Sequence, residues 1–237
     1  MKLDNKELYD LLTEKGIHYL HHANTVSTSI TFITQEGLMS RGGIESKGLF
    51  QSAQSSDDAD KRFNVWNDIF LDSVDLHGYY PRQNFYGPIL FKFPVELLLL
   101  KDYNVWITKD NPIYWTTAMT DSEKYFTSVK ELREKWDLHQ RQKKMITIRN
   151  VLEPILFEHL TEIIIDNPNV RIKEIVLLNE SVAGFKAAIV GKPHLINKFK
   201  LRSCSGSCYC RDNYLTKVTT RDLKKLFLPA DHPEFTK

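Results

Sequence analysis

The chain has 237 residues and a nearly balanced formal charge of +2, with 42% apolar and 26% charged residues. These proportions are ordinary for a folded protein and exclude global intrinsic disorder. The longest leucine run covers residues 97–100, well short of the roughly 20 apolar residues of a membrane span, and the polar N-terminus MKLDNKELYD does not read as a signal peptide.

The first forty residues predict alternating helices and short strands. Leucines that recur on one face, with Asp4 as the cap, predict a helix over residues 4–15. A strand over 17–22 follows, and then a second helix, for which Asn24 is the expected cap and Gly37 the end. A further extended segment begins at residues 38–39. Helices and strands thus alternate from the start of the chain.

Residues 40–88 form the least regular part of the sequence. Glycines, serines and charged residues are mixed there as in a loop. A loop of this length in a compact domain is usually functional or disordered. Within it, Trp66, Ile69, Phe70 and Leu71 could pack as a short helix or strand. Its last part is rich in aromatic residues, so we expect it to fold back onto the core.

The remaining elements are predicted from periodicity and from the positions of prolines. Strands are expected over 89–93, 105–108, 145–148 and 172–178, and helices over 94–100, 121–136, 154–165 and 193–201. This mixed order favours an α+β fold over a doubly wound sheet. We expect a single domain over residues 1–237, with a basic, cysteine-containing C-terminal segment from about residue 192.

Charge is unevenly distributed along the chain. Residues 1–60 hold nine acids and five bases, whereas residues 192–225 hold nine bases and two acids. The basic region can be a footprint for phosphates, or simply a solvated surface. Further basic and aromatic residues could form a groove that holds phosphates and stacks on unpaired nucleobases. They are Lys130, Arg133, Lys135, Trp136, Arg141, Lys143, Lys144, Arg149, Tyr209 and Tyr214.

Three polar positions stand apart from the core pattern. His22 and Asn24 occupy a corner between a strand and a helix, where an imidazole and backbone amides can meet a polar ligand. Arg41 can clamp a phosphate or pyrophosphate. Glu174 lies in the apolar stretch Ile172–Leu178, where a carboxylate is costly unless it is paired or functional. The alternatives are a hydrogen-bonded corner histidine, a surface arginine, and a glutamate paired with neighbouring bases.

Taken in order, these motifs resemble a known family. YLHHAN followed by a helix, then GLMSR, then a long loop, then Glu174 with three aliphatic residues after it, is similar to the ADP-ribosyltransferases, and in particular to DarT-type toxins, which modify nucleic-acid bases. The resemblance spans about residues 17–180. Asn24 stands where the family more often has threonine or serine, and Glu180 is a second, less favoured acid.

The resemblance implies a fold, an activity and a set of roles. The fold would be that of the family, with split mixed β-sheets and surrounding helices. NAD would be the substrate, with Glu174 catalytic and His22, Asn24, Arg41 and Phe70 binding NAD. ADP-ribose would pass to a DNA or RNA base, in a toxin–antitoxin or phage-defence system with a neutralising antitoxin protein. The alternatives are transfer to a protein side chain and a non-catalytic nucleic-acid-binding module.

The three cysteines all lie within Cys204–Cys210. Their clustering argues against a secreted disulfide framework and favours a reducing, cytoplasmic location. With a histidine such as His194 they could bind zinc. The spacing is not that of a standard zinc ribbon or finger, so reduced thiols without a metal are the prediction.

Overall fold

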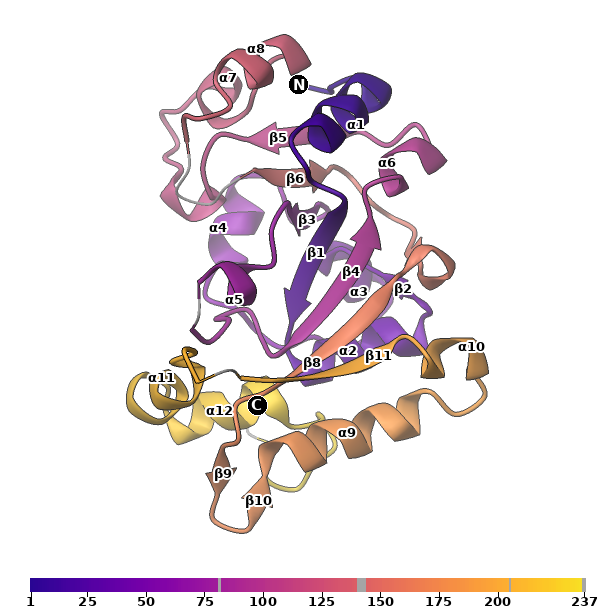
Figure 1. Cartoon of the computed structure of the whole chain (residues 1–237), viewed down its shortest axis with the longest axis vertical. Coiled ribbons are helices and arrows are strands. Elements are labelled where there is room, and N and C mark those ends of the chain that lie inside the picture. Colours follow the sequence, from indigo (N-terminus) through magenta and orange to yellow (C-terminus); the bar gives the residue numbers. More distant parts are fainter. Residues whose placement is uncertain (81, 140–143, 205, 236–237) are drawn as a thin grey trace.

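A computed structural model of the chain describes residues 1–80, 82–139, 144–204 and 206–235. Its centre is a mixed seven-stranded sheet of order β11-β8-β4-β1-β3-β6-β5 (Figure 1). Neighbouring strands are antiparallel except for the parallel pair β8 and β11. The strands are β1 (Tyr19–Asn24), β3 (Ile69–Asp72), β4 (Ile89–Pro94), β5 (Val105–Thr108), β6 (Met145–Ile148), β8 (Glu162–Asn167) and β11 (Phe199–Ser203).

The sheet is joined narrowly at its middle. Strands β1 and β4 pair along all six residues of β1, but β1 and β3 share the single register pair His21–Asp72. The four strands β11-β8-β4-β1 and the three strands β3-β6-β5 therefore form two sections. Two further sheets have two strands each, β2 (Gly37–Leu38) with β7 (Ile155–Leu156), and β9 (Arg171–Ile172) with β10 (Ile175–Val176).

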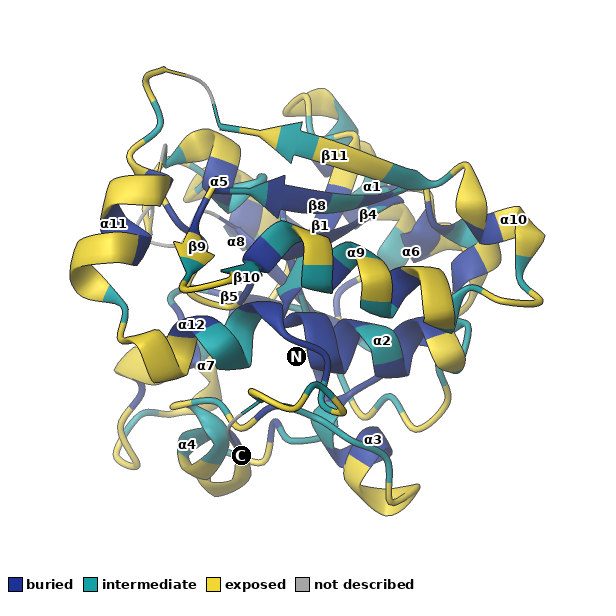
Figure 2. Ribbon diagram, turned by 90° about the horizontal axis from the view of Figure 1, so that it is seen from below, coloured by how far each residue is buried: buried dark blue, intermediate teal, exposed yellow. Residues whose placement is uncertain are grey.

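Helices cover the sheet and its ends. Helices α2 and α9 lie beside one another along one face of the sheet (Figure 2). Helix α1 packs against α6 and α8 at the end where β5 lies. The described helices are α1 (Asn5–Glu14), α2 (Val26–Thr34), α3 (Arg41–Ser46), α4 (Asp57–Arg62), α5 (Leu76–Tyr79), α6 (Leu97–Leu100), α7 (Asp121–Lys124), α8 (Val129–Glu134), α9 (Leu177–Ala188), α10 (Pro193–Ile196), α11 (Cys210–Lys217) and α12 (Thr220–Phe227), with short 3-10 turns at Pro112–Tyr114 and Phe157–His159.

The core between the sheet and α2 is aromatic. The ring of Phe91 on β4 stacks on Phe157 and meets Phe32 of α2 edge-on, and all three side chains are buried. Buried aromatic rings contribute both area and specific ring geometry. This core fixes α2, and with it the corner where β1 ends. The α+β fold class is confirmed. No described helix has both the length and the apolar character that crossing a bilayer requires.

Several predicted elements are present as expected. Helix α1 begins after Asp4, whose carboxylate accepts a hydrogen bond from the backbone amide of Glu7. Strands β4, β5 and β6 also lie where the sequence predicted them. Each of these segments carries its own local signal, so tertiary contacts did not have to override it.

Two predictions in the second half of the chain are wrong. Residues 154–165 do not form a helix; they hold β7, a 3-10 turn and the start of β8, because the isoleucines of β8 pair with β4 in the middle of the sheet. Residues 172–178 do not form one central strand. The chain turns at Lys173, whose φ is 52°, and α9 begins at Leu177.

Other boundaries are corrected as well. Residues 40–88 are not one long loop, since they contain α3, α4, β3 and α5. Asn24 is the last residue of β1, and Thr25 caps α2 instead. The helix expected over 121–136 is split into α7 and α8, where Tyr125 bridges to Thr108 of β5. The segment predicted as a helix over 193–201 ends its helix at Ile196 and enters β11.

Candidate functional site

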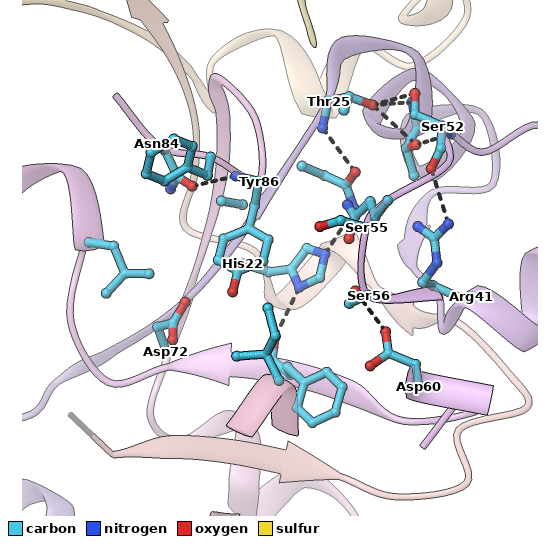
Figure 3. Close-up of a pocket in the computed structure, with 18 of the residues that line it drawn as sticks. His22, Thr25, Arg41, Ser52, Ser55, Ser56, Asp60, Asp72, Asn84 and Tyr86 are labelled. Carbon is cyan, nitrogen blue, oxygen red and sulfur yellow. Dashed lines mark hydrogen bonds between the residues drawn. The ribbon is translucent and has the colours of Figure 1, made fainter. Parts of the chain in front are cut away.

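A large cavity opens near the narrow junction of β1 and β3. Its volume is about 1080 Å³, at the upper end of the range for small-molecule sites. Figure 3 shows His22 in the middle, with Arg41 and Asp60 on one side and Tyr86 and Asp72 on the other. The cavity is lined by four of the five residues singled out from the sequence, His22, Asn24, Arg41 and Phe70.

The imidazole of His22 is locked by its neighbours. Its Nδ1 lies 2.9 Å from the carbonyl oxygen of Phe70, and its Nε2 lies 3.2 Å from the amide nitrogen of Asn24. Desolvation of this half-buried ring lowers the pKa of His22 to about 4, so the ring is neutral at neutral pH. Nδ1–H therefore donates to Phe70, and Nε2 accepts from Asn24. The corner is rigid and uncharged.

Arg41 brings a buried positive charge to the cavity. Its Nη2 donates to the carbonyl of Ser52 at 3.0 Å and to Asp57 at 2.8 Å, and its guanidinium lies 5.1 Å from the ring centre of Trp66. Its Nε and Nη1 are buried without any acceptor among the described residues. Burial lowers the pKa of Arg41, which Asp57 opposes, but an arginine stays protonated. Two charged donor groups thus lack a partner.

The opposite end of the cavity carries amide and phenol groups. Gln83 is buried, and both its side-chain oxygen and its nitrogen lack a partner among the described residues. The hydroxyl of Tyr86 accepts a hydrogen bond from Asn111 at 3.1 Å, and the backbone amide of Tyr86 donates to Asn84. Buried polar atoms without partners are rare in folded proteins unless a ligand or water satisfies them.

Four aspartates of the described residues line the cavity, Asp60, Asp68, Asp72 and Asp222, and two of them flank His22. Asp60 accepts a hydrogen bond from Ser56, and burial raises its pKa to about 6. Asp72 ends β3 at the junction, where its backbone pairs with His21 of β1. Both carboxylates line the cavity, on opposite sides of His22 (Figure 3).

Glu174 is not part of this cavity. It lies in the tight turn between β9 and β10, its side chain is 95% exposed, and it pairs with Arg171. The expectation that it sits in a central strand and shares a cavity with His22 is therefore wrong. Glu180 is on α9 and lies 3.5 Å from His232. It does not line the cavity either.

A second glutamate starts an aliphatic run that really is a strand. Glu162 precedes three isoleucines at the beginning of β8, in the main sheet. Its carboxylate lies 3.2 Å from Nζ of Lys92 on β4 and does not line the cavity. The same short pattern thus occurs at Glu162 and Glu174, and sequence periodicity selected the one that lies in a turn.

Aromatic and basic side chains gather at the edge of the cavity. The guanidinium of Arg82 lies 5.2 Å from the ring centre of Tyr80 and 5.5 Å from that of Phe85. A smaller neighbouring cavity shares Tyr80, Arg82 and Lys217 with the main one and adds Tyr209, which is 66% exposed. We call Tyr80, Arg82, Phe85, Tyr209 and Lys217 the aromatic rim.

Only some of the basic and aromatic residues predicted for a phosphate groove lie at the cavity. Lys217 and Lys225 line the main cavity, but Arg202 is held by Asp75 and Asp166. Tyr214 is buried against Phe227, so it cannot stack on a base. Arg141 and Lys143 lie outside the described residues. The C-terminal charge is thus only partly directed at the cavity.

No protein-family model and no curated protein matches this chain. The function is therefore argued from the cavity and its residues. Sequence reasoning missed Asp60, Asp72 and Gln83, because all three lie in the stretch interpreted as loop. The alternation of Ile69 to Asp72 was the signal that could have placed Asp72 at a strand end.

Proposed function

We propose that the chain is an NAD-dependent ADP-ribosyltransferase whose substrate site is the cavity around His22. One observation carries the proposal. The cavity joins four residues of the family resemblance from three different elements, and two of its lining residues, Arg41 and Gln83, carry buried polar atoms that lack partners among the described residues. A dinucleotide offers phosphate oxygens to such a guanidinium and amide and ring nitrogens to such a carboxamide.

The two ends of the cavity suggest how NAD would lie. Arg41 would hold the pyrophosphate with Nε and Nη1, since charge-assisted hydrogen bonds to phosphate are the strong ones. The neutral corner of His22 and Asn24 would orient the ribose in the middle. Phe70, whose carbonyl fixes His22, would offer its ring to the nicotinamide. Such orientation makes the attack effectively intramolecular.

Asp72 is the carboxylate that the cavity offers in place of Glu174. Cleavage of the bond between nicotinamide nitrogen and ribose C1′ leaves the electron pair on nicotinamide and positive charge on the ribose. A carboxylate beside the ribose stabilises that charge. The acceptor then bonds to C1′ and loses its proton, for which Asp72 can serve as the base.

The aromatic rim favours a nucleic acid as acceptor. Proteins usually bind single strands by stacking nucleobases on exposed aromatic rings and by attracting the phosphates with basic side chains. Arg82 and Lys217 are such basic side chains. The rim adjoins the cavity through Tyr80 and Arg82, so a stacked strand could present a base to the ribose. An accompanying antitoxin protein, as the resemblance implies, would neutralise the activity in cells.

The direct test is incubation with NAD carrying a label in its adenylate half, together with RNA, single-stranded DNA or cell lysate. Nuclease-sensitive label supports a nucleic-acid acceptor. Protease-sensitive label would move the acceptor to a protein side chain. No label at all, with salt-sensitive binding of nucleic acid, would leave a binding module and contradict the proposed enzyme.

Variants test the assigned roles. Asp72→Asn is expected to lower transfer at least about 100-fold, because the charge on the ribose loses its stabilising carboxylate, while NAD affinity changes little. Glu174→Gln, a similar loss of one charge at an exposed position, is expected to leave transfer intact. Growth arrest by the expressed chain, relieved by Asp72→Asn, is the matching readout in cells. Full activity of Asp72→Asn together with loss in Glu162→Gln would overturn the assignment.

Arg41 is tested by binding. Arg41→Gln is expected to weaken NAD binding about 10- to 100-fold, the size of one or two charge-assisted hydrogen bonds. Calorimetric titration with NAD measures this, and thermal unfolding reports whether the loss of the pair with Asp57 disturbs the fold. Arg62→Gln is the matched control, since Arg62 is exposed at the end of α4. Equal affinities of the two variants would contradict a pyrophosphate contact at Arg41.

A further inference from the structure

Four potential metal ligands converge outside the cavity. One ligand atom each of His77, Cys204, Cys208 and Cys210 lies within 4.8 Å of all the others. His77 comes from α5, Cys204 and Cys208 come from the segment between β11 and α11, and Cys210 is the first residue of α11. His77 and Cys210 are buried, and Cys204 and Cys208 are half-buried. The histidine that completes the cluster is more than 120 residues away from the cysteines in sequence.

The donor set and its spacing suit zinc. Three thiolates and one imidazole are a common tetrahedral set, with Zn–S about 2.3 Å and Zn–N about 2.05 Å. Those bond lengths separate N from S by about 3.6 Å at the tetrahedral angle. Nε2 of His77 lies 3.5 Å from Sγ of Cys208. The imidazole therefore already approaches a thiol at the separation that two ligands of one zinc ion would have.

Cys204 and Cys210 are joined as a disulfide in the structure, with their Cα atoms 7.2 Å apart. Most disulfides bridge Cα atoms closer than about 6.8 Å. Two thiolates that share one metal ion do not need so short a separation. The backbone is thus spaced more suitably for a reduced pair around an ion.

The other nitrogen of the imidazole lies beside a carboxylate. Nδ1 of His77 is 3.1 Å from a carboxylate oxygen of Asp166, and both side chains are buried, but the present orientation of the ring does not give Nδ1 a hydrogen bond among the described residues. Arg202 in turn holds Asp166 and also pairs with Asp75, which caps α5. A carboxylate on the second nitrogen fixes the tautomer and the orientation of a zinc-binding histidine and raises its basicity.

We propose that reduced Cys204, Cys208 and Cys210 and Nε2 of His77 bind one structural Zn²⁺ ion, with Asp166 orienting the imidazole. Four protein ligands close the coordination shell, so the ion has no open position for chemistry. It ties α5 to the start of α11 across a very long stretch of chain. Leu76 at the start of α5 and Lys217 at the end of α11 both line the main cavity, so the ion would fix that wall.

The test uses the full chain purified under reducing conditions without chelator. Elemental analysis is expected to find about one zinc per chain. Exchange for Co²⁺ is expected to give the visible absorption and the sulfur-to-metal charge-transfer bands of a tetrahedral thiolate site. His77→Ala is expected to lower zinc affinity at least 100-fold by loss of a ligand. His194→Ala is the matched control, because His194 is half-exposed and pairs with Glu36.

A variant beside the ligands keeps the proposal testable if His77→Ala does not fold. Asp166→Asn keeps all four ligands and is expected to lower zinc affinity about 10- to 100-fold, with the Co²⁺ spectrum retained. Two results together would overturn the proposal. The chain would purify without metal, with one free thiol and one disulfide after reduction and reoxidation, and added Zn²⁺ would leave its unfolding temperature unchanged.

Discussion

The imidazole of His22 is half-buried and makes two defined hydrogen bonds. Phe70 accepts from one ring nitrogen and Asn24 donates to the other. Protonation would place a second N–H against the amide donor of Asn24 and a charge in a desolvated site, close to the guanidinium of Arg41, which lowers the pKa of His22 further. The neutral ring is thus a positioning group in the cavity. Its protonation is expected to change the free energy of unfolding.

The pH dependence of stability follows from this. The pKa of His22 falls from 6.5 in the unfolded chain to about 4 in the folded chain. Between these values the unfolded chain binds a proton that the folded chain excludes, so stability falls as the pH falls from 6.5 to about 4. The shift corresponds to about 3 kcal/mol. Urea unfolding from about pH 7 to about pH 4 is expected to show this loss in the native chain and not in His22→Gln.

Other groups titrate in the same pH range. Their contributions to stability cancel when the native chain is compared with His22→Gln. The raised pKa of Asp60, about 6, acts in the opposite sense, because the folded chain holds the proton that the unfolded chain releases. Burial also lowers the pKa of His21. Both groups are present in the native chain and in the variant. Parallel pH profiles of the two proteins would contradict the desolvated, neutral state of His22.

At the scale of elements, the segment that leads into β4 determines how the corner is closed. Gly87 has a φ of 140°, and a Cβ atom there would stand 2.1 Å from the carbonyl oxygen of Asn24. No side chain fits at this point, so the backbone before β4 rests directly on the backbone after His22. Tyr86, which precedes this glycine, is thereby held at the cavity.

Substitution of this glycine tests the contact. Gly87→Ala is expected to destabilise the fold by at least about 2 kcal/mol more than Gly191→Ala, because both positions have positive φ but only Gly87 would clash. Chemical unfolding measures the difference. NAD affinity is expected to fall with Gly87→Ala and to stay unchanged with Gly191→Ala. Equal destabilisation by the two substitutions would show that the segment can move away from the corner.

At the scale of the whole molecule, binding of a nucleic-acid acceptor depends on where basic and aromatic side chains are concentrated, and less on the net charge of the chain. The chain carries only +2 overall, but the aromatic rim concentrates bases and rings beside one cavity. Tyr209→Ala is expected to raise the KM for a single-stranded acceptor about tenfold through the loss of one stacking surface, with NAD binding unchanged. Tyr19→Ala, at an exposed tyrosine that lines neither cavity, is the control. An unchanged KM would exclude stacking at Tyr209.

The sequence predicted some helices and strands correctly and others wrongly. The leucine face and the Asp4 cap of α1 predicted that helix, partial alternation predicted β4, and short apolar stretches predicted β5 and β6. The isoleucines of β8 were assigned to a helix, since a short aliphatic run has no periodicity that separates a buried strand from a buried helix. Residues 172–178 were likewise predicted as one central strand, so the expected acid, Glu174, was placed in a strand although it lies in a turn.

The order of the sequence motifs, through a family resemblance, suggested that His22, Asn24, Arg41 and Phe70 belong together. The amino-acid sequence by itself determined the α+β class, the cap of α1 and the simplest strands. These features depend on residues that are close in sequence, whose propensities act locally. Only the tertiary structure decided which acids line the cavity, that Glu174 is exposed, and that His77 meets the three cysteines. Such contacts join segments far apart in the chain, and they are set by sheet pairing and side-chain packing, which no local pattern encodes.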